Sequence, residues 1–186
     1  MIRLALTRVW ASVRRLRALR SCQVRREDVR LELSRLGILG RSFSIDDELK
    51  SAVERYTRLG KLTVERYPDR HEGIVSDNRL EEGVLADVSY SQDNNEAVIL
   101  IRESLESRPW PTYELCLLHE LSHLIGKHHL KHPHLQLHES TIRRSWTCPQ
   151  TDQHRIEVEA RQRAKLLLLA HVAPEAFEQA GVDRVA

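Results

Sequence analysis

The sequence predicts an α+β fold built as a single domain, and three observations support this prediction. The chain has 186 residues, the size of one domain with a terminal extension. Hydrophobic residues make up 41% and charged residues 30%, so the chain can form a packed core. Helical patterns near both ends flank two strand-like segments, residues 84–90 and 97–102.

Composition excludes several classes of protein. No run approaches the roughly 18 apolar residues that a membrane span needs, so we expect no transmembrane segment. Cys22, Cys116 and Cys148 lie far apart and form no CxxC pair. This spacing excludes a disulfide scaffold and a zinc ribbon, and it favours a reducing compartment. We therefore expect a cytoplasmic protein.

Residues 1–28 are predicted to be a basic, amphipathic N-terminal extension. Residues 1–26 contain eight arginines and no acidic residue, whereas the rest of the chain carries a net charge of −6. Apolar residues recur with helical spacing over residues 2–20. This helix can pack on the domain, bind a membrane or nucleic acid, or act as a targeting segment, since it is similar to a mitochondrial transit peptide. The domain itself is expected to span residues 29–186.

The first helices of the domain are predicted from their end signals. A helix over residues 26–37 ends at Gly37. The next begins at Ser44, whose hydroxyl can cap it ahead of three acidic residues, and runs to Leu59.

The remaining elements follow from alternation, helical periodicity and prolines. Strands are expected over 62–66, 84–90 and 97–102, helices over 112–126, 152–171 and 174–180, and mostly loop over 127–153.

The pattern His-Glu-Leu-Ser-His at residues 119–123 carries the chemistry. His119 and His123 are four residues apart, so on a helix they project about 40° from each other and can bind one metal ion. Glu120 lies at the flank of that face, where its carboxylate can take a proton from a metal-activated water. The alternative is a helix whose histidines are solvated or satisfied in the core. The apolar residues fall opposite the histidines: Leu117, Leu118, Leu121, Leu124 and Ile125.

A catalytic zinc site needs a third protein ligand, and the helix over 152–171 offers Glu157 and Glu159. The two project about 200° apart, so they cannot both reach one ion. Glu157 falls in the middle of the apolar stripe, where a carboxylate without a cation is costly to bury. Glu157 is therefore the predicted ligand; the alternative is an ordinary exposed glutamate. The stripe consists of Ile156, Ala160, Ala164, Leu167 and Leu168.

Other polar residues near the motif are expected to have lesser roles. Cys116, one turn before His119, is predicted to be a small neighbour of the site and not a ligand. Tyr113 and His154 are candidates for stabilising an oxyanion. Five later histidines follow no fixed metal spacing and are expected to be mostly solvated loop residues: His128, His129, His132, His134 and His138.

The order of elements resembles the ImmA/IrrE family of bacterial metallopeptidases. The resemblance covers about residues 30–170 and is specific at two helices, CLLHELSHLIGKHH (116–129) and IEVEARQRAKLLLLA (156–170). It implies a zincin, gluzincin-like fold, in which a small sheet packs on the HExxH helix and on a C-terminal helix that bears a glutamate. It also implies a helical N-terminal part.

The resemblance also implies a site. It places His119, His123 and Glu157 on the zinc ligands and Glu120 on the catalytic glutamate; Mn²⁺ or Fe²⁺ can substitute, because a set of two histidines and a glutamate is not selective. The family usually carries Asn, Asp or Glu where this chain has Arg161. If that position supports the ligands through a hydrogen bond, this chain must support them in another way.

Three functions are compatible with the sequence. The resemblance implies a metallo-endopeptidase that cleaves or controls a partner protein, a DNA-binding repressor or an antitoxin, in transcription regulation or a toxin–antitoxin system. The second hypothesis is a metal-stabilised protein that binds such a partner and cleaves nothing. The third is a protein that binds nucleic acid or a membrane through its arginine-rich N-terminal arm.

Overall fold

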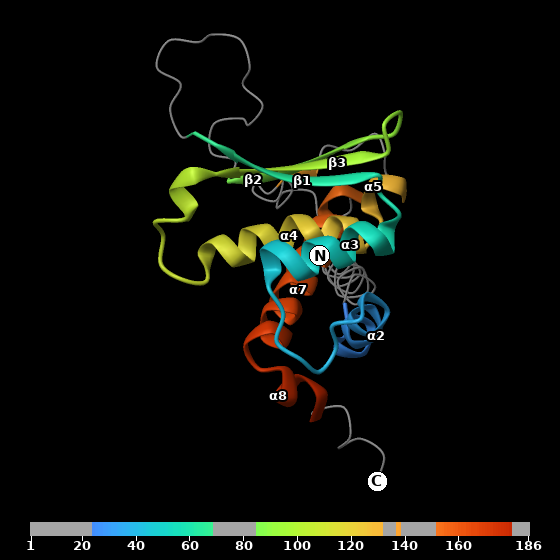
Figure 1. The fold of residues 1–186 in the computed structure, drawn as a ribbon, viewed down its shortest axis with the longest axis vertical. Coiled ribbons are helices and arrows are strands. Elements are labelled where there is room, and N and C mark those ends of the chain that lie inside the picture. Colours follow the sequence, from blue (N-terminus) through green and yellow to red (C-terminus); the bar gives the residue numbers. More distant parts are fainter. Residues whose placement is uncertain (1–23, 69–84, 132–136, 139–151, 180–186) are drawn as a thin grey trace, which may run out of the picture.

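The computed structural model describes residues 24–68, 85–131, 137–138 and 152–179. Within these residues the chain has the predicted α+β fold, with helices packed against a small sheet (Figure 1). The predicted extension over residues 1–28 lies almost entirely outside the described residues. Its role and the domain boundary therefore stay predictions.

The sheet has four strands in the order β1–β3–β2–β4. β1 pairs parallel to β3, whereas β2 pairs antiparallel to both β3 and β4. β3 is the most enclosed strand, because its pairing on both sides and its apolar sequence bury Ala97, Ile99 and Ile101 completely. The three predicted strands are confirmed; β4 was not predicted. The strands are β1 (Lys61–Tyr67), β2 (Ala86–Ser91), β3 (Glu96–Arg102) and β4 (Leu137–His138).

The helices predicted within the described residues are present, with ends within a few residues of the expected ones. The helix predicted over residues 2–20 lies outside the described residues. The described helices are α2 (Arg26–Leu36), the π-helical turn η1 (Ile45–Leu49), α3 (Lys50–Thr57), the 3₁₀ turn η2 (Glu103–Leu105), α4 (Thr112–Ile125), α5 (His128–Lys131), α7 (Asp152–Val172) and α8 (Pro174–Gln179). α5 is a correction, since this segment was predicted to be loop.

The entry to α3 differs from the prediction in its geometry. Ser44 caps the segment as expected, since its side chain accepts a hydrogen bond from the Asp47 N–H. The first turn is π-helical, because the Leu49 N–H donates to the Ser44 carbonyl, five residues back. In this wider turn Ile45 and Leu49 are both buried in the core.

α4 lies between the sheet and α7 (Figure 1). Every residue of α4 from Cys116 to Ile125 is buried. The apolar face of the helix joins the main hydrophobic core, as predicted. The histidine face is enclosed as well, because α7 covers it with a stripe that includes Ala160 and Ala164. None of the described helices is long and apolar enough to cross a bilayer.

The burial of α2 gives a test of the core. Leu33 is 1% exposed and Leu31 is 52% exposed, although both lie on the same helix. We expect Leu33→Ala to lower the free energy of unfolding by about 2–5 kcal/mol, because it leaves a cavity in the core. Leu31→Ala, the matched control, should stay within about 0.5 kcal/mol. Chemical denaturation of both variants measures this, and equal losses would contradict the packing of α2.

Candidate metal centre

Three side chains from two helices meet in the interior. His119 and His123 project from α4, and Glu157 projects from α7, which lies alongside it (Figure 1). His123 and Glu157 have no exposed surface, and His119 is 5% exposed. The apolar stripe of α7 therefore carries Glu157 inward, as its place in the sequence predicts.

The potential ligand atoms lie close to the separations found in a tetrahedral metal site. Nε2 of His119 lies 3.1 Å from Oε2 of Glu157 and 3.2 Å from Nε2 of His123. Nε2 of His123 lies 3.6 Å from Oε1 of Glu157. Ligands placed tetrahedrally about 2.0–2.2 Å from a zinc ion are roughly 3.3–3.6 Å apart. The three residues form a buried cluster that can hold a metal ion.

The hydrogen bonding of the cluster also fits a cation. Oε1 of Glu157 is buried and has no hydrogen-bond partner among the described residues. The two imidazoles turn their Nε2 atoms toward each other and toward this carboxylate. A buried group of acceptors is costly unless something positive satisfies it. A divalent ion bound by all three residues would satisfy it.

The protonation of the cluster suits metal binding. Burial lowers the pKa of His123 to about 4, so its imidazole is neutral at pH 7. Burial raises the pKa of Glu157, but the close contacts with His119 and His123 outweigh this effect and bring the pKa to about 2. A neutral imidazole and an ionised carboxylate are the forms that bind a metal.

Glu120, the predicted base, follows His119 on α4, and its side chain is completely buried. The structure thus places a carboxylate at the next position along the helix from a metal-ligand candidate. Its role in proton transfer stays a prediction.

The other predicted neighbours are less involved. Cys116 lines the same small cavity as His119. The Tyr113 hydroxyl donates a hydrogen bond to Asp46 at 2.9 Å, and burial and this hydrogen bond raise its pKa. This bond directs Tyr113 toward η1. The side chain of His154 lies outside the described residues.

The expectation of solvated histidines after the motif is wrong for two of them. His128 and His129 are 1% and 5% exposed, because α5 folds back against α4 and brings both rings inside. The ring of His129 packs on Tyr90, with centroids 4.6 Å apart. His132 and His134 lie outside the described residues, as does the side chain of His138. In the sequence, the glycine at position 126 is a signal for the burial of His128, because it leaves room for a ring that folds back two residues later.

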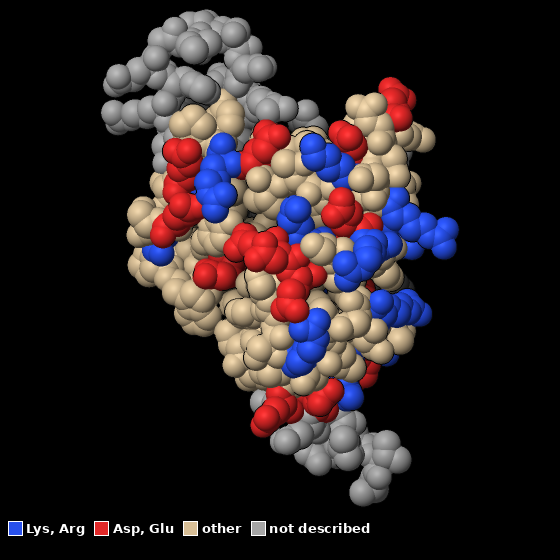
Figure 2. Space-filling view, viewed as in Figure 1, with Lys and Arg blue, Asp and Glu red and all other residues tan. Residues whose placement is uncertain are grey.

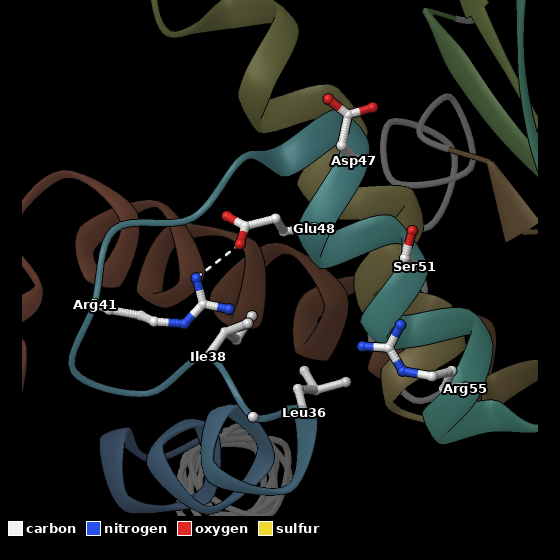
Figure 3. Close-up of a pocket in the computed structure, with 8 residues that line it drawn as sticks. Leu36, Ile38, Arg41, Asp47, Glu48, Ser51 and Arg55 are labelled. Atoms are coloured by element: carbon white, nitrogen blue, oxygen red, sulfur yellow. Dashed lines mark hydrogen bonds and ion pairs between the residues drawn. The ribbon is translucent and has the colours of Figure 1, made fainter.

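A cavity of about 230 Å³ leads to the cluster. It is lined by Cys116 and His119 from α4, by Arg161 and Lys165 from α7, and by Leu115 and Ala164. A larger cavity of about 410 Å³ lies between the end of α2 and α3 (Figure 3). Its lining contains none of the metal-ligand candidates, and its Arg41 is neutralised by Glu48 at 2.7 Å. The smaller cavity is therefore the one relevant to the cluster.

Comparison of the chain with protein-family models, curated protein sequences and solved structures gives no match.

The pKa shifts predict how acid acts on the metal-free protein. Between pH 6.5 and pH 4 the unfolded chain protonates His123 and the folded chain does not. The free energy of unfolding should therefore fall as the pH drops through this window, by on the order of 3 kcal/mol from His123 alone. Below about pH 4.5 the ionised Glu157 adds a loss in the same direction. Denaturation at a series of pH values measures the slope, and His123→Gln should reduce it; an unchanged slope would contradict the burial of a neutral imidazole.

Removal of the carboxylate tests the ligand set. Glu157→Gln keeps the shape of the side chain but lacks its charge, so zinc affinity should fall by more than the roughly 10–100-fold that accompanies the loss of a supporting hydrogen bond. Competition with a chelator gives the affinity, and elemental analysis gives the zinc content. Glu175→Gln, an exposed glutamate of α8, is the control and should bind zinc normally. A folded Glu157→Gln protein with wild-type affinity would remove Glu157 from the ligand set.

Proposed function

We propose that the chain is a zinc-dependent endopeptidase with a zincin-like site. His119, His123 and Glu157 hold the metal, and Mn²⁺ or Fe²⁺ can take its place. The observation that supports the proposal most is the buried meeting of these three side chains, with Glu120 next to His119 on the same helix. Two imidazoles and one carboxylate leave a fourth position for water, as catalytic zinc sites do.

Lewis-acid activation of a water molecule and of the scissile carbonyl is the chemistry that a divalent ion supplies when bound by these residues. Glu120 accepts the proton of the attacking water and returns it to the leaving amine. His119 and His123 bind and orient through their Nε2 atoms.

The cavity beside His119 indicates how a substrate approaches. Leu115 and Ala164 give it apolar walls, while Arg161 and Lys165 bring two positive charges to its lining. Lys165 is exposed and has no ion-pair partner among the described residues. We therefore propose that the site favours a peptide segment with a carboxylate near the cleaved bond.

The identity of the partner is proposed on the resemblance of the two helices alone. That resemblance favours a DNA-binding repressor or an antitoxin as the protein that is cleaved or controlled. Because repressors and antitoxins act inside the cell, the proposed partner favours a cytoplasmic location.

A second function, metal-dependent partner binding without cleavage, is favoured by one observation. His123, Glu120 and Glu157 have no exposed surface, and enclosure of this kind is typical of structural metal sites. The third hypothesis concerns residues 1–28, which lie almost entirely outside the described residues. On the face shown in Figure 2, lysines and arginines are interspersed with acidic residues, which does not favour a nucleic-acid surface there.

Replacement of Glu120 separates cleavage from metal binding. Glu120→Gln should keep the zinc content of the wild type and lose all peptide cleavage, because the amide cannot take the proton. The assay incubates zinc-loaded protein with a library of peptides and identifies new termini by mass spectrometry. The wild type should produce peptides enriched in Asp or Glu near the cleaved bond, and Lys165→Glu should reduce this enrichment.

The outcomes of this assay distinguish the hypotheses. Cleavage by Glu120→Gln at the wild-type rate would show that Glu120 is not the base. Zinc-bound wild-type protein that cleaves no peptide would favour the partner-binding function.

A further inference from the structure

A second histidine lies behind His123. Nδ1 of His123 is 3.0 Å from Nδ1 of His128, and Nε2 of His128 is 3.4 Å from Oε2 of Glu159. The chain of contacts thus runs from the metal-ligand candidate on α4, through α5, to a carboxylate on α7. Both histidines are buried, and Glu159 is about a quarter exposed, with 27% of its side-chain surface accessible.

The donors and acceptors along this series of contacts can be assigned in one consistent way. An ionised Glu159 can only accept, so Nε2 of His128 carries the hydrogen. A neutral His128 then has its lone pair on Nδ1, and Nδ1 of His123 must donate to it. His123 is left with its lone pair on Nε2, the atom that faces His119 and Glu157.

We propose that His128 and Glu159 are positioning residues that hold His123 in the tautomer and orientation in which Nε2 binds the metal. This inference deepens the proposed function and rests on its metal site. A metal-bound histidine usually donates its other ring N–H to a fixed acceptor, which sets the tautomer and strengthens the ligand. Here the acceptor is a second imidazole, which a carboxylate orients in turn.

The local sequence places His128 for this role. Lys127 adopts a left-handed conformation with φ 55°, which turns the chain back at the end of α4. The Lys131 ammonium donates to the Gly126 carbonyl at 2.9 Å and secures the turn. α5 therefore starts with His128 directed against the histidine face of α4.

Gly126 provides the space that His128 occupies. A Cβ atom at this position would lie 2.7 Å from Nε2 of His128 and 3.1 Å from Nη1 of Arg163. The backbone of Gly126 is right-handed helical, so the glycine is needed for room and not for conformation. Arg163 is itself fixed by Glu32 of α2, whose carboxylate accepts from its Nε at 3.0 Å. Thus Gly126 of α4 and Arg163 of α7 lie near the His128 ring, and α2 holds Arg163 in place.

This arrangement would support the metal-ligand candidates without help from Arg161. The supporting hydrogen bond reaches His123 from α5, and the carboxylate that completes it lies two residues before Arg161 on α7.

The experiment uses the full chain labelled with ¹⁵N and reads the imidazole tautomers by long-range ¹H–¹⁵N correlation. In the wild type, with and without zinc, His123 should be protonated at Nδ1. In His128→Phe that preference should be lost, and zinc affinity in chelator competition should fall roughly 10–100-fold. His128→Asn should recover much of the loss, because its amide oxygen lies near the position of Nδ1 and can accept.

Two further changes keep the test informative if His128→Phe fails to fold. Glu159→Ala removes the acceptor and should weaken zinc binding roughly tenfold, whereas Glu159→Gln keeps an accepting oxygen and should bind nearly as the wild type does.

Gly126→Ala should shift His128 and lower zinc affinity without removing any polar group. His129→Phe is the matched control, since His129 is the next residue, is buried and packs on Tyr90, and it should leave both readouts unchanged.

The outcomes separate this inference from the proposed function. If a folded His128→Phe protein keeps the His123 tautomer and the wild-type zinc affinity, the positioning role is overturned while the metal site stands. A different result would separate them in the other direction. If the wild type binds no zinc, and His123 is protonated at Nδ1 in the wild type but not in His128→Phe, the positioning role stands and the proposed function falls.

Discussion

The approach of α7 to the histidine face of α4 is the constraint on which the rest of the structure depends. It brings a carboxylate within 3.1 Å of one imidazole and 3.6 Å of another. Such an approach requires small side chains between the helices, and Ala160 and Ala164 supply them from α7. The sheet and α3 then pack against other sides of α4.

This packing makes metal binding and folding parts of one equilibrium. Without an ion, the protein holds the ionised carboxylate of Glu157 and the neutral imidazole of His123 out of water, which opposes folding. With an ion, the same groups become ligands, and the binding free energy adds to the stability of the folded chain. The polar contacts around the cluster, from His128 to the Arg163–Glu32 ion pair, restrain the helices that carry the ligands.

The sequence predicts those features whose causes are local. Helix ends follow Gly37 and Ser44, and the position of Glu157 in an apolar stripe indicates which way it points. The features that were missed have tertiary causes. His128 was assigned to a solvated loop because its burial depends on the turn at Lys127 and on contacts with α7, which no spacing rule expresses. The order of the strands and the short β4 likewise depend on pairing between distant segments.

Enclosure of the cluster limits which chemistry can take place there. A cavity of about 230 Å³ holds several water molecules, each of which takes about 30 Å³, so water has a route to His119. The cavity is smaller than the roughly 300–1,000 Å³ of a typical small-molecule site, so it admits little more than one side chain or one peptide unit. Under the proposed function, a substrate would therefore have to present an extended segment and not a folded surface. Arg161 and Lys165 line this cavity, so their positive charges would act on such a segment before it reached the ligand candidates. Selection by charge and by extended shape would then precede any selection by the sequence at the cleaved bond.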